Sequence, residues 1–80
     1  MNDFGTAARA VAGDQRALDD LWREHRRWVA TVLLAHKPRV AELDDLLQEV
    51  AVILVERVTE LREPARLRPW LRRVAVNVAR

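Results

Sequence analysis

Cysteine, serine and tyrosine are absent from this chain of 80 residues, and glycine occurs only at Gly5 and Gly13. Without cysteine there is no disulfide framework and no thiolate ligand for a metal ion. Histidine occurs at His25 and His36, without the paired spacing of a metal site. The sequence also lacks a glycine-rich phosphate loop and a nucleophile with a plausible base. We therefore expect neither an enzyme nor a bound metal or cofactor.

Long hydrophobic runs are also missing. The longest, Val50–Val55, is far shorter than the ~20 apolar residues that span a bilayer, and no segment resembles a signal peptide. We expect a soluble, cytoplasmic protein without membrane contacts, and the lack of cysteine suits a reducing compartment.

The remaining composition is typical of one small helical domain. Half of the residues are hydrophobic, 32% are charged, and three are proline. Apolar residues recur at helical spacing, so we predict an all-α fold, a compact bundle of about four helices. The predicted helices cover residues 4–12, 15–36, 42–61 and 69–80.

Two features of the second half of the chain bear on these boundaries. The β-branched stretch within 42–61 has the propensity of a buried strand, but the helical period continues on both sides of it. Because a residue before proline avoids the helical region, we predict that Glu63 and Arg68 are non-helical and that Pro69 is the first residue of the last helix. Residues 62–68 are predicted to form a loop or one short turn.

Charge is distributed unevenly along the chain, although the net charge is only +2. Residues 42–56 contain five acidic and no basic residues, whereas residues 57–80 contain seven arginines and two glutamates. A compositional bias could supply the arginines, but it would not separate them from the acids. We infer two surfaces with different partners.

The helix predicted at 42–61 carries an acidic face opposite its apolar stripe. At helical spacing this face contains Asp45, Gln48, Glu49, Val52 and Glu56, with Asp44 beside it. Two interpretations are open. The acids form a solvated face whose first members favour the helix macrodipole, or they surround an exposed valine on which a basic helix of a partner docks.

The last helix and the preceding loop carry residues that suit nucleic acid. They are Arg62, Arg66, Arg68, Trp70, Arg73, Asn77 and Arg80. The last four follow one another at spacings of three, four and three, so they form one stripe. An indole stacks on an unpaired base, arginine binds phosphate and asparagine pairs with a base edge. Core packing of the tryptophan and solvation of the arginines are the alternatives.

Three segments of the sequence, taken in order, resemble a known family. They are AVAGDQRALDDLWREHRRWV, DDLLQEVAVILVERV and RLRPWLRRVAVNVAR. Together they resemble region 2 of bacterial sigma factors of the sigma-70 family, in particular the extracytoplasmic-function (ECF) group. The resemblance covers nearly the whole chain.

The resemblance implies a role in transcription initiation. The loop at 62–68 would capture the non-template strand of the −10 promoter element together with Trp70, Arg73 and Asn77 of the last helix. An anti-sigma factor is a further partner that the resemblance allows. The helix with DDLLQE would bind the clamp helices of the β′ subunit of core RNA polymerase, and its residues there are Asp44, Asp45, Gln48, Glu49 and Val52.

The chain departs from the family pattern in the loop. ECF members often have an aromatic residue, a glycine and a second aromatic residue where this chain has Leu61, Glu63 and Leu67, so the preferred −10 sequence is not implied. The family's second domain, region 4, which reads the −35 element, is absent from these 80 residues. The helical period continues to Arg80, so either the last helix frays there or the chain is the front piece of a longer protein. Complete members of the family continue past this stretch, so the resemblance implies the second alternative.

Two other functions fit the sequence. A sigma-like module could bind polymerase or an anti-sigma protein without contacting DNA. A small helical protein could instead read duplex DNA through a recognition helix.

Overall fold

Four α-helices form the frame of the protein. The computed structural model describes residues 3–36 and 38–80. The helices are α1 (Asp3–Val11), α2 (Gln15–Leu34), α3 (Leu43–Arg57) and α4 (Leu67–Ala79), and three short 3₁₀ turns are η1 (Val40–Glu42), η2 (Val58–Glu60) and η3 (Pro64–Arg66). No strand occurs in this described part of the chain. The prediction of an all-α bundle is therefore confirmed.

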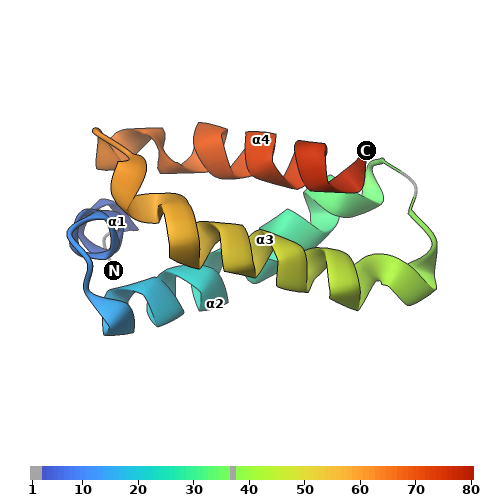
Figure 1. Cartoon of the computed structure of the whole chain (residues 1–80), viewed down its shortest axis with the longest axis horizontal. Coiled ribbons are helices and arrows are strands. Elements are labelled where there is room, and N and C mark those ends of the chain that lie inside the picture. The colour runs from blue at the N-terminus through green and yellow to red at the C-terminus, as the bar shows by residue number, and fades with distance from the viewer. Residues whose placement is uncertain (1–2, 37) are drawn as a thin grey trace.

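The three longer helices lie along the long axis of the molecule, and each reverses the direction of the one before it (Figure 1). α1 lies across one end, beside the connection from α3 to α4, and is seen nearly along its own axis. It packs on α2 and on both η2 and η3. Residues 58–66 therefore have a helix packed against them.

One apolar core is shared between the helices. Among its fully buried side chains are Leu21 and Leu33 of α2, Leu54 of α3 and Leu71 of α4. Full burial of a leucine side chain contributes about 1.5–3 kcal/mol relative to exposure, so contacts of this kind hold the bundle together. Leu21 and Leu33 both lie on α2, whereas Leu54 and Leu71 come from α3 and α4, so the core joins three helices.

His25 belongs to the same apolar stripe of α2 and is buried, with 4% of its surface exposed. Its Nδ1 donates a hydrogen bond to the carbonyl oxygen of Leu21 at 2.8 Å. Its ring also meets the Trp28 ring edge-on, with 6.3 Å between the centroids. His25 is thus a core residue whose Nδ1 has a hydrogen-bond partner. In the described ranges no group of three potential ligands could hold a metal ion.

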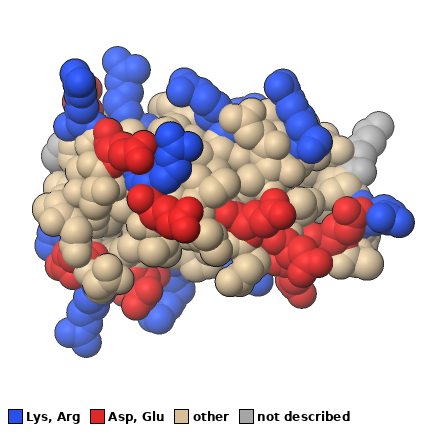
Figure 2. Space-filling model, in the orientation of Figure 1, with Lys and Arg blue, Asp and Glu red and all other residues tan. Residues whose placement is uncertain are grey.

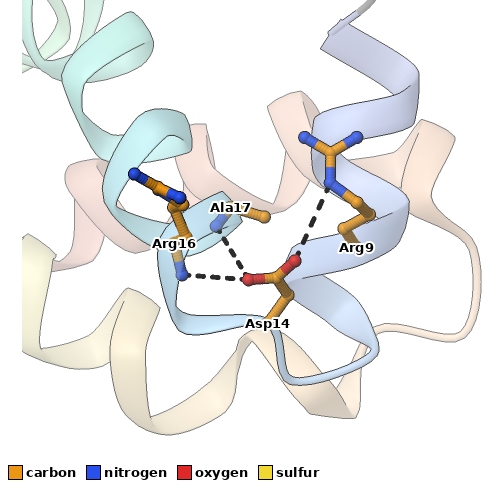
Figure 3. A network of polar contacts seen from close by, with 4 residues as sticks. All are labelled: Arg9, Asp14, Arg16 and Ala17. Carbon is orange, nitrogen blue, oxygen red and sulfur yellow. Dashed lines mark hydrogen bonds and ion pairs between the residues drawn. The ribbon is translucent and has the colours of Figure 1, made fainter.

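The junction between α1 and α2 is encoded by two adjacent residues. Gly13 adopts φ 98°, in the left-handed region that glycine tolerates. Asp14 then caps α2, because its Oδ1 accepts hydrogen bonds from the backbone N–H groups of Arg16 at 3.0 Å and Ala17 at 3.2 Å (Figure 3). Its Oδ2 lies 3.9 Å from Arg9 Nε, which ties the cap to α1. A short, fixed turn results.

The helix predicted at 42–61 is shorter in the structure. Its α-helical part is Leu43–Arg57, and η2 forms the last turn before Leu61 takes an extended backbone with ψ 127°. Within a single turn, the apolar spacing of an α-helix and that of a 3₁₀ helix are nearly the same, so the sequence pattern does not distinguish them. The tighter turn redirects the chain towards α4.

The start of the last helix differs from the prediction in the opposite direction. Glu63 is extended, as predicted, with φ −124° and ψ 116°. Arg68 is helical, however, and Pro69 is the third residue of α4 instead of the first. The first four N–H groups of a helix have no partner within the helix, so proline at the third position costs no hydrogen bond there. The bias against helix before proline is overcome by burial of Leu67, which is 4% exposed.

In the residues that the structure describes, no helix combines the length and apolar character required to cross a bilayer.

Candidate functional site

An open hollow of about 280 Å³ lies where the α3–α4 connection meets the first turns of α4. Its lining residues are Leu61, Arg62, Glu63, Arg66, Pro69, Trp70 and Arg73. Four of the residues that the sequence predicts for nucleic-acid binding therefore meet at one place. The hollow combines an indole, apolar side chains and three guanidinium groups. This mixture suits an unstacked base together with its phosphates.

Trp70 has two functions in this arrangement. It is half-buried and packs against the core, so the prediction of core packing holds for part of the side chain. The remainder of the side chain contributes to the wall of the hollow. Because the core restrains the indole, a base that stacks on it meets a surface already in place, which lowers the ordering cost of binding.

Glu63 places a negative charge within the same hollow. Its Oε2 lies 3.7 Å from Arg66 Nε, and the two side chains are 70% and 74% exposed. An exposed pair of this kind contributes little to stability, but it neutralises part of the positive charge that a phosphate would meet. Of the three departures from the family pattern, Leu61 and Glu63 line the hollow, whereas Leu67 belongs to the core.

Three other predicted residues of α4 lie outside the lining of the hollow. Asn77 and Arg80 are exposed farther along the helix and continue the stripe of Trp70 and Arg73. Arg68 departs from the group because it is two residues from Trp70, so the two side chains point roughly 200° apart around the helix axis. Its guanidinium carbon lies 4.4 Å from the ring centroid of Trp28, on α2.

The acidic face of α3 is exposed along its length. Asp45, Gln48 and Glu49 are exposed, and 44% of the surface of Val52 is accessible. Figure 2 shows acidic side chains in a band over α3, whereas basic side chains project from the edge above α4. A largely apolar hollow of about 270 Å³ is lined by Gln48, Glu49, Val52 and Ile53. An apolar patch surrounded by acidic residues is what a basic partner helix needs in order to dock on this face.

Asp44 lies at the side of this face, towards α2. Its Oδ1 is 3.9 Å from Arg26 Nη2, and its side chain is 92% exposed, so the pair is weak and easily separated. A polar hollow of about 240 Å³ lies beside it and is lined by Trp22, Arg26, Asp44, Leu47 and Gln48. The proximity of Trp22 and Arg26 to α3 has no local signal in the sequence, because it depends on how α2 and α3 pack.

The turn before α3 holds an ion pair that affects the pKa of its carboxyl group. Arg39 Nε donates a hydrogen bond to Glu42 Oε1 at 2.7 Å. This hydrogen bond, and then the charge of the guanidinium, hold the pKa of Glu42 below its ordinary value. Glu42 thus stays ionised and adds to the negative potential at the start of α3.

The structure defines a small all-helical domain with an acidic surface on one helix and a basic, aromatic surface on the next. Residues 21–80 match the family model of sigma-70 region 2, and the chain belongs to this family. The resemblance seen in the sequence is confirmed.

Two sigma factors are similar to this chain. The probable RNA polymerase sigma factor RfaY of Xanthomonas campestris pv. campestris is 34% identical over 71 residues, which cover 89% of this chain and 18% of that protein. RNA polymerase sigma factor NccH of Alcaligenes xylosoxydans xylosoxydans is 28% identical over 78 residues, which cover 98% of this chain and 42% of that protein. The chain therefore spans less than half the length of these curated relatives. No solved structure matches it.

Proposed function

We propose that this chain is the part of an RNA polymerase sigma factor that docks on core polymerase and recognises and helps to melt the −10 promoter element. The role is non-enzymatic and belongs to the bacterial cytoplasm, where polymerase acts. The single observation that carries the proposal is the hollow, because it gathers Arg62, Arg66, Trp70 and Arg73 from the loop and from α4. Membership of the sigma-70 region 2 family supports it.

In the proposed complex, the hollow receives a base of the non-template strand. The indole of Trp70 offers a stacking surface and the guanidinium groups neutralise the adjacent phosphates. Asn77, farther along α4, presents a donor and an acceptor to a base edge. Removing a base from the duplex stack costs a few kcal/mol, so the isolated domain binds promoter DNA weakly and contacts of the polymerase offset the cost.

Docking on polymerase is assigned to α3. Val52 and Ile53 provide the apolar contact. Asp45 and Glu49 provide negative charge that is complementary to a basic partner helix, and the proposed partner is the pair of clamp helices of the β′ subunit. Asp44 joins this surface once its long contact with Arg26 is exchanged for one with the partner.

Binding of a −10-containing single strand and of its duplex, both with core polymerase present, tests the proposal. We expect the single strand to bind at least tenfold more tightly, because only the opened strand can place a base in the hollow without the cost of unstacking. Equal affinity for the two forms would contradict it and favour a duplex-reading protein. Polymerase binding without any DNA effect would favour an interaction module.

The same assay separates base reading from phosphate binding. Asn77→Ala is expected to change the base preference, whereas Arg80→Ala weakens binding to all sequences alike.

A further inference from the structure

We propose that Trp28 of α2 is a positioning residue that holds the guanidinium of Arg68 ready for a phosphate of the promoter strand. The inference rests on the proposed function and deepens it, because it adds α2 to a DNA-binding surface otherwise formed by the α3–α4 connection and α4. Its basis is the stacked pair, in which the Arg68 guanidinium carbon lies 4.4 Å from the Trp28 ring centroid.

The surroundings of the two side chains differ in a way that suits this role. Trp28 is half-buried and packs against the core, so its ring is fixed. Arg68 is exposed. A guanidinium has five N–H donors, and contact of its carbon with the face of an indole leaves donors at its edge that can bind phosphate.

Two other arginines, at the end of α3 and in η3, are paired with acidic residues. Arg66 lies 3.7 Å from Glu63, and Arg57 lies 3.2 Å from Glu60. Arg68 is held in another way, because its guanidinium lies over an aromatic ring. Because Arg68 is exposed and its guanidinium rests on the ring, the side chain is restrained while its charge remains accessible to a ligand.

The position of Arg68 connects this charge to the proposed strand. Arg66 and Trp70, two residues before and after it, both line the hollow. In the proposed complex, a strand that leaves the hollow and crosses the first turn of α4 towards α2 would reach the Arg68 guanidinium. Because Arg68 points to the opposite side of α4 from Trp70, it would bind a phosphate next to the captured nucleotide, and not the captured nucleotide itself.

A double-mutant cycle in the complex with core polymerase tests the inference. Affinity for the −10 single strand is measured at several salt concentrations for the whole chain and for Trp28→Leu, Arg68→Ala and the double variant. We expect Trp28→Leu to weaken binding roughly two- to fivefold. Loss of one phosphate contact should reduce the slope of log K against log salt by about 0.7 in Arg68→Ala. Trp28→Leu should have no further effect once Arg68 is removed.

Arg72 supplies a matched control, because it is an exposed arginine one turn farther along the same helix. The effects of Arg72→Ala and Trp28→Leu should multiply, since no aromatic contact of Arg72 occurs in the described part of the chain. Trp28→Phe, which keeps an aromatic face, should retain most of the affinity. If the effects of Trp28→Leu and Arg68→Ala also multiply, or if Trp28→Leu leaves binding unchanged, the inference is wrong.

NMR of the free protein gives a readout that needs no DNA. The Arg68 side-chain protons should be shifted upfield by the indole ring current in the natural chain, less so in Trp28→Phe, and not in Trp28→Leu. Absence of the shift in the natural chain would overturn the inference on its own. If the natural chain fails to prefer single-stranded DNA, the proposed function fails with it, whereas normal preference without coupling rejects only the role of Trp28.

Discussion

Glu63 is the residue whose chemistry fits the proposed site least well. It lines the hollow together with three arginines, so it adds a negative charge where a phosphate is proposed to bind. Its ion pair with Arg66 is long, at 3.7 Å, and both side chains are mostly exposed. The charge therefore acts chiefly on an incoming anion and hardly on the stability of the fold.

Replacing Glu63 should accordingly strengthen DNA binding. We expect Glu63→Gln to raise the affinity for the −10 single strand roughly two- to fivefold at low salt, because it removes a repulsive charge and releases Arg66. The gain should diminish as salt is added. The measurement is a salt series of single-strand binding with core polymerase present.

Glu60 provides the control for this substitution. It is similarly exposed and lies 3.2 Å from Arg57, but it is not part of the lining of the hollow. Glu60→Gln should have a clearly smaller effect. Equal gains in the two variants would mean that only the overall charge of the domain matters.

At the scale of the element, α3 keeps its two functions on opposite faces. Leu47, Val50 and Leu54 are buried in the core, whereas Asp45 and Glu49 are exposed on the other side of the helix. Substitutions on the acidic face can therefore change docking without removing core contacts.

Charge reversal of this face should prevent binding to polymerase. We expect the double variant Asp45→Lys and Glu49→Lys to lower recovery of core polymerase in a pull-down at least tenfold, because like charges then face the basic partner helix. The thermal unfolding curve should remain cooperative. The reversal of Asp19 and Asp20 on α2, also to Lys, changes the net charge equally and should leave recovery intact. Retained recovery in the α3 variant would show that the acids are only solvated.

The sequence predicts the helices well where the apolar period runs for several turns. The start of α2 coincides with the prediction, and the apolar residues that recur at helical spacing from Leu18 to Leu33 are buried or half-buried. The predictions fail at the ends of α3 and α4, where a single turn decides between α and 3₁₀ geometry and where the burial of Leu67 prevails over the effect of Pro69 on its neighbour. These outcomes depend on tertiary packing, which local spacing does not contain.

The candidate site shows the same division. Trp70 and Arg73 are neighbours on one helix, so their spacing alone predicts that they lie together. The stacking of Arg68 on Trp28 joins residues 40 positions apart, and the proximity of Arg26 to Asp44 also crosses between helices. Neither contact leaves a local pattern in the sequence.

The whole molecule places two oppositely charged surfaces on adjacent helices within a body 34 Å long. Polymerase docking is proposed for α3, and base reading for α4 and the loop before it. Because no residue is shared between the two proposed sets, the two activities should be separable by mutation.

The double variant Arg73→Ala and Asn77→Ala tests this separation. We expect it to bind core polymerase within about twofold of the natural chain, and to lose selection among −10 sequences, since the base-edge and phosphate contacts of α4 are removed. The two measurements are a polymerase pull-down and a selection from randomised −10 strands. A parallel loss of polymerase binding would mean that the surfaces act as one.

The packing of α1 against η2 and η3 has a consequence for how the hollow moves. Short 3₁₀ turns contain few hydrogen bonds and do not hold their shape alone. The two turns are therefore stabilised by their packing against α1, which lies near the other end of the sequence. Amide protons of residues 58–66 should exchange with solvent together with those of α1, as one locally unfolding unit. The lifetime of the hollow would then be set by how often the first helix of the chain lifts away.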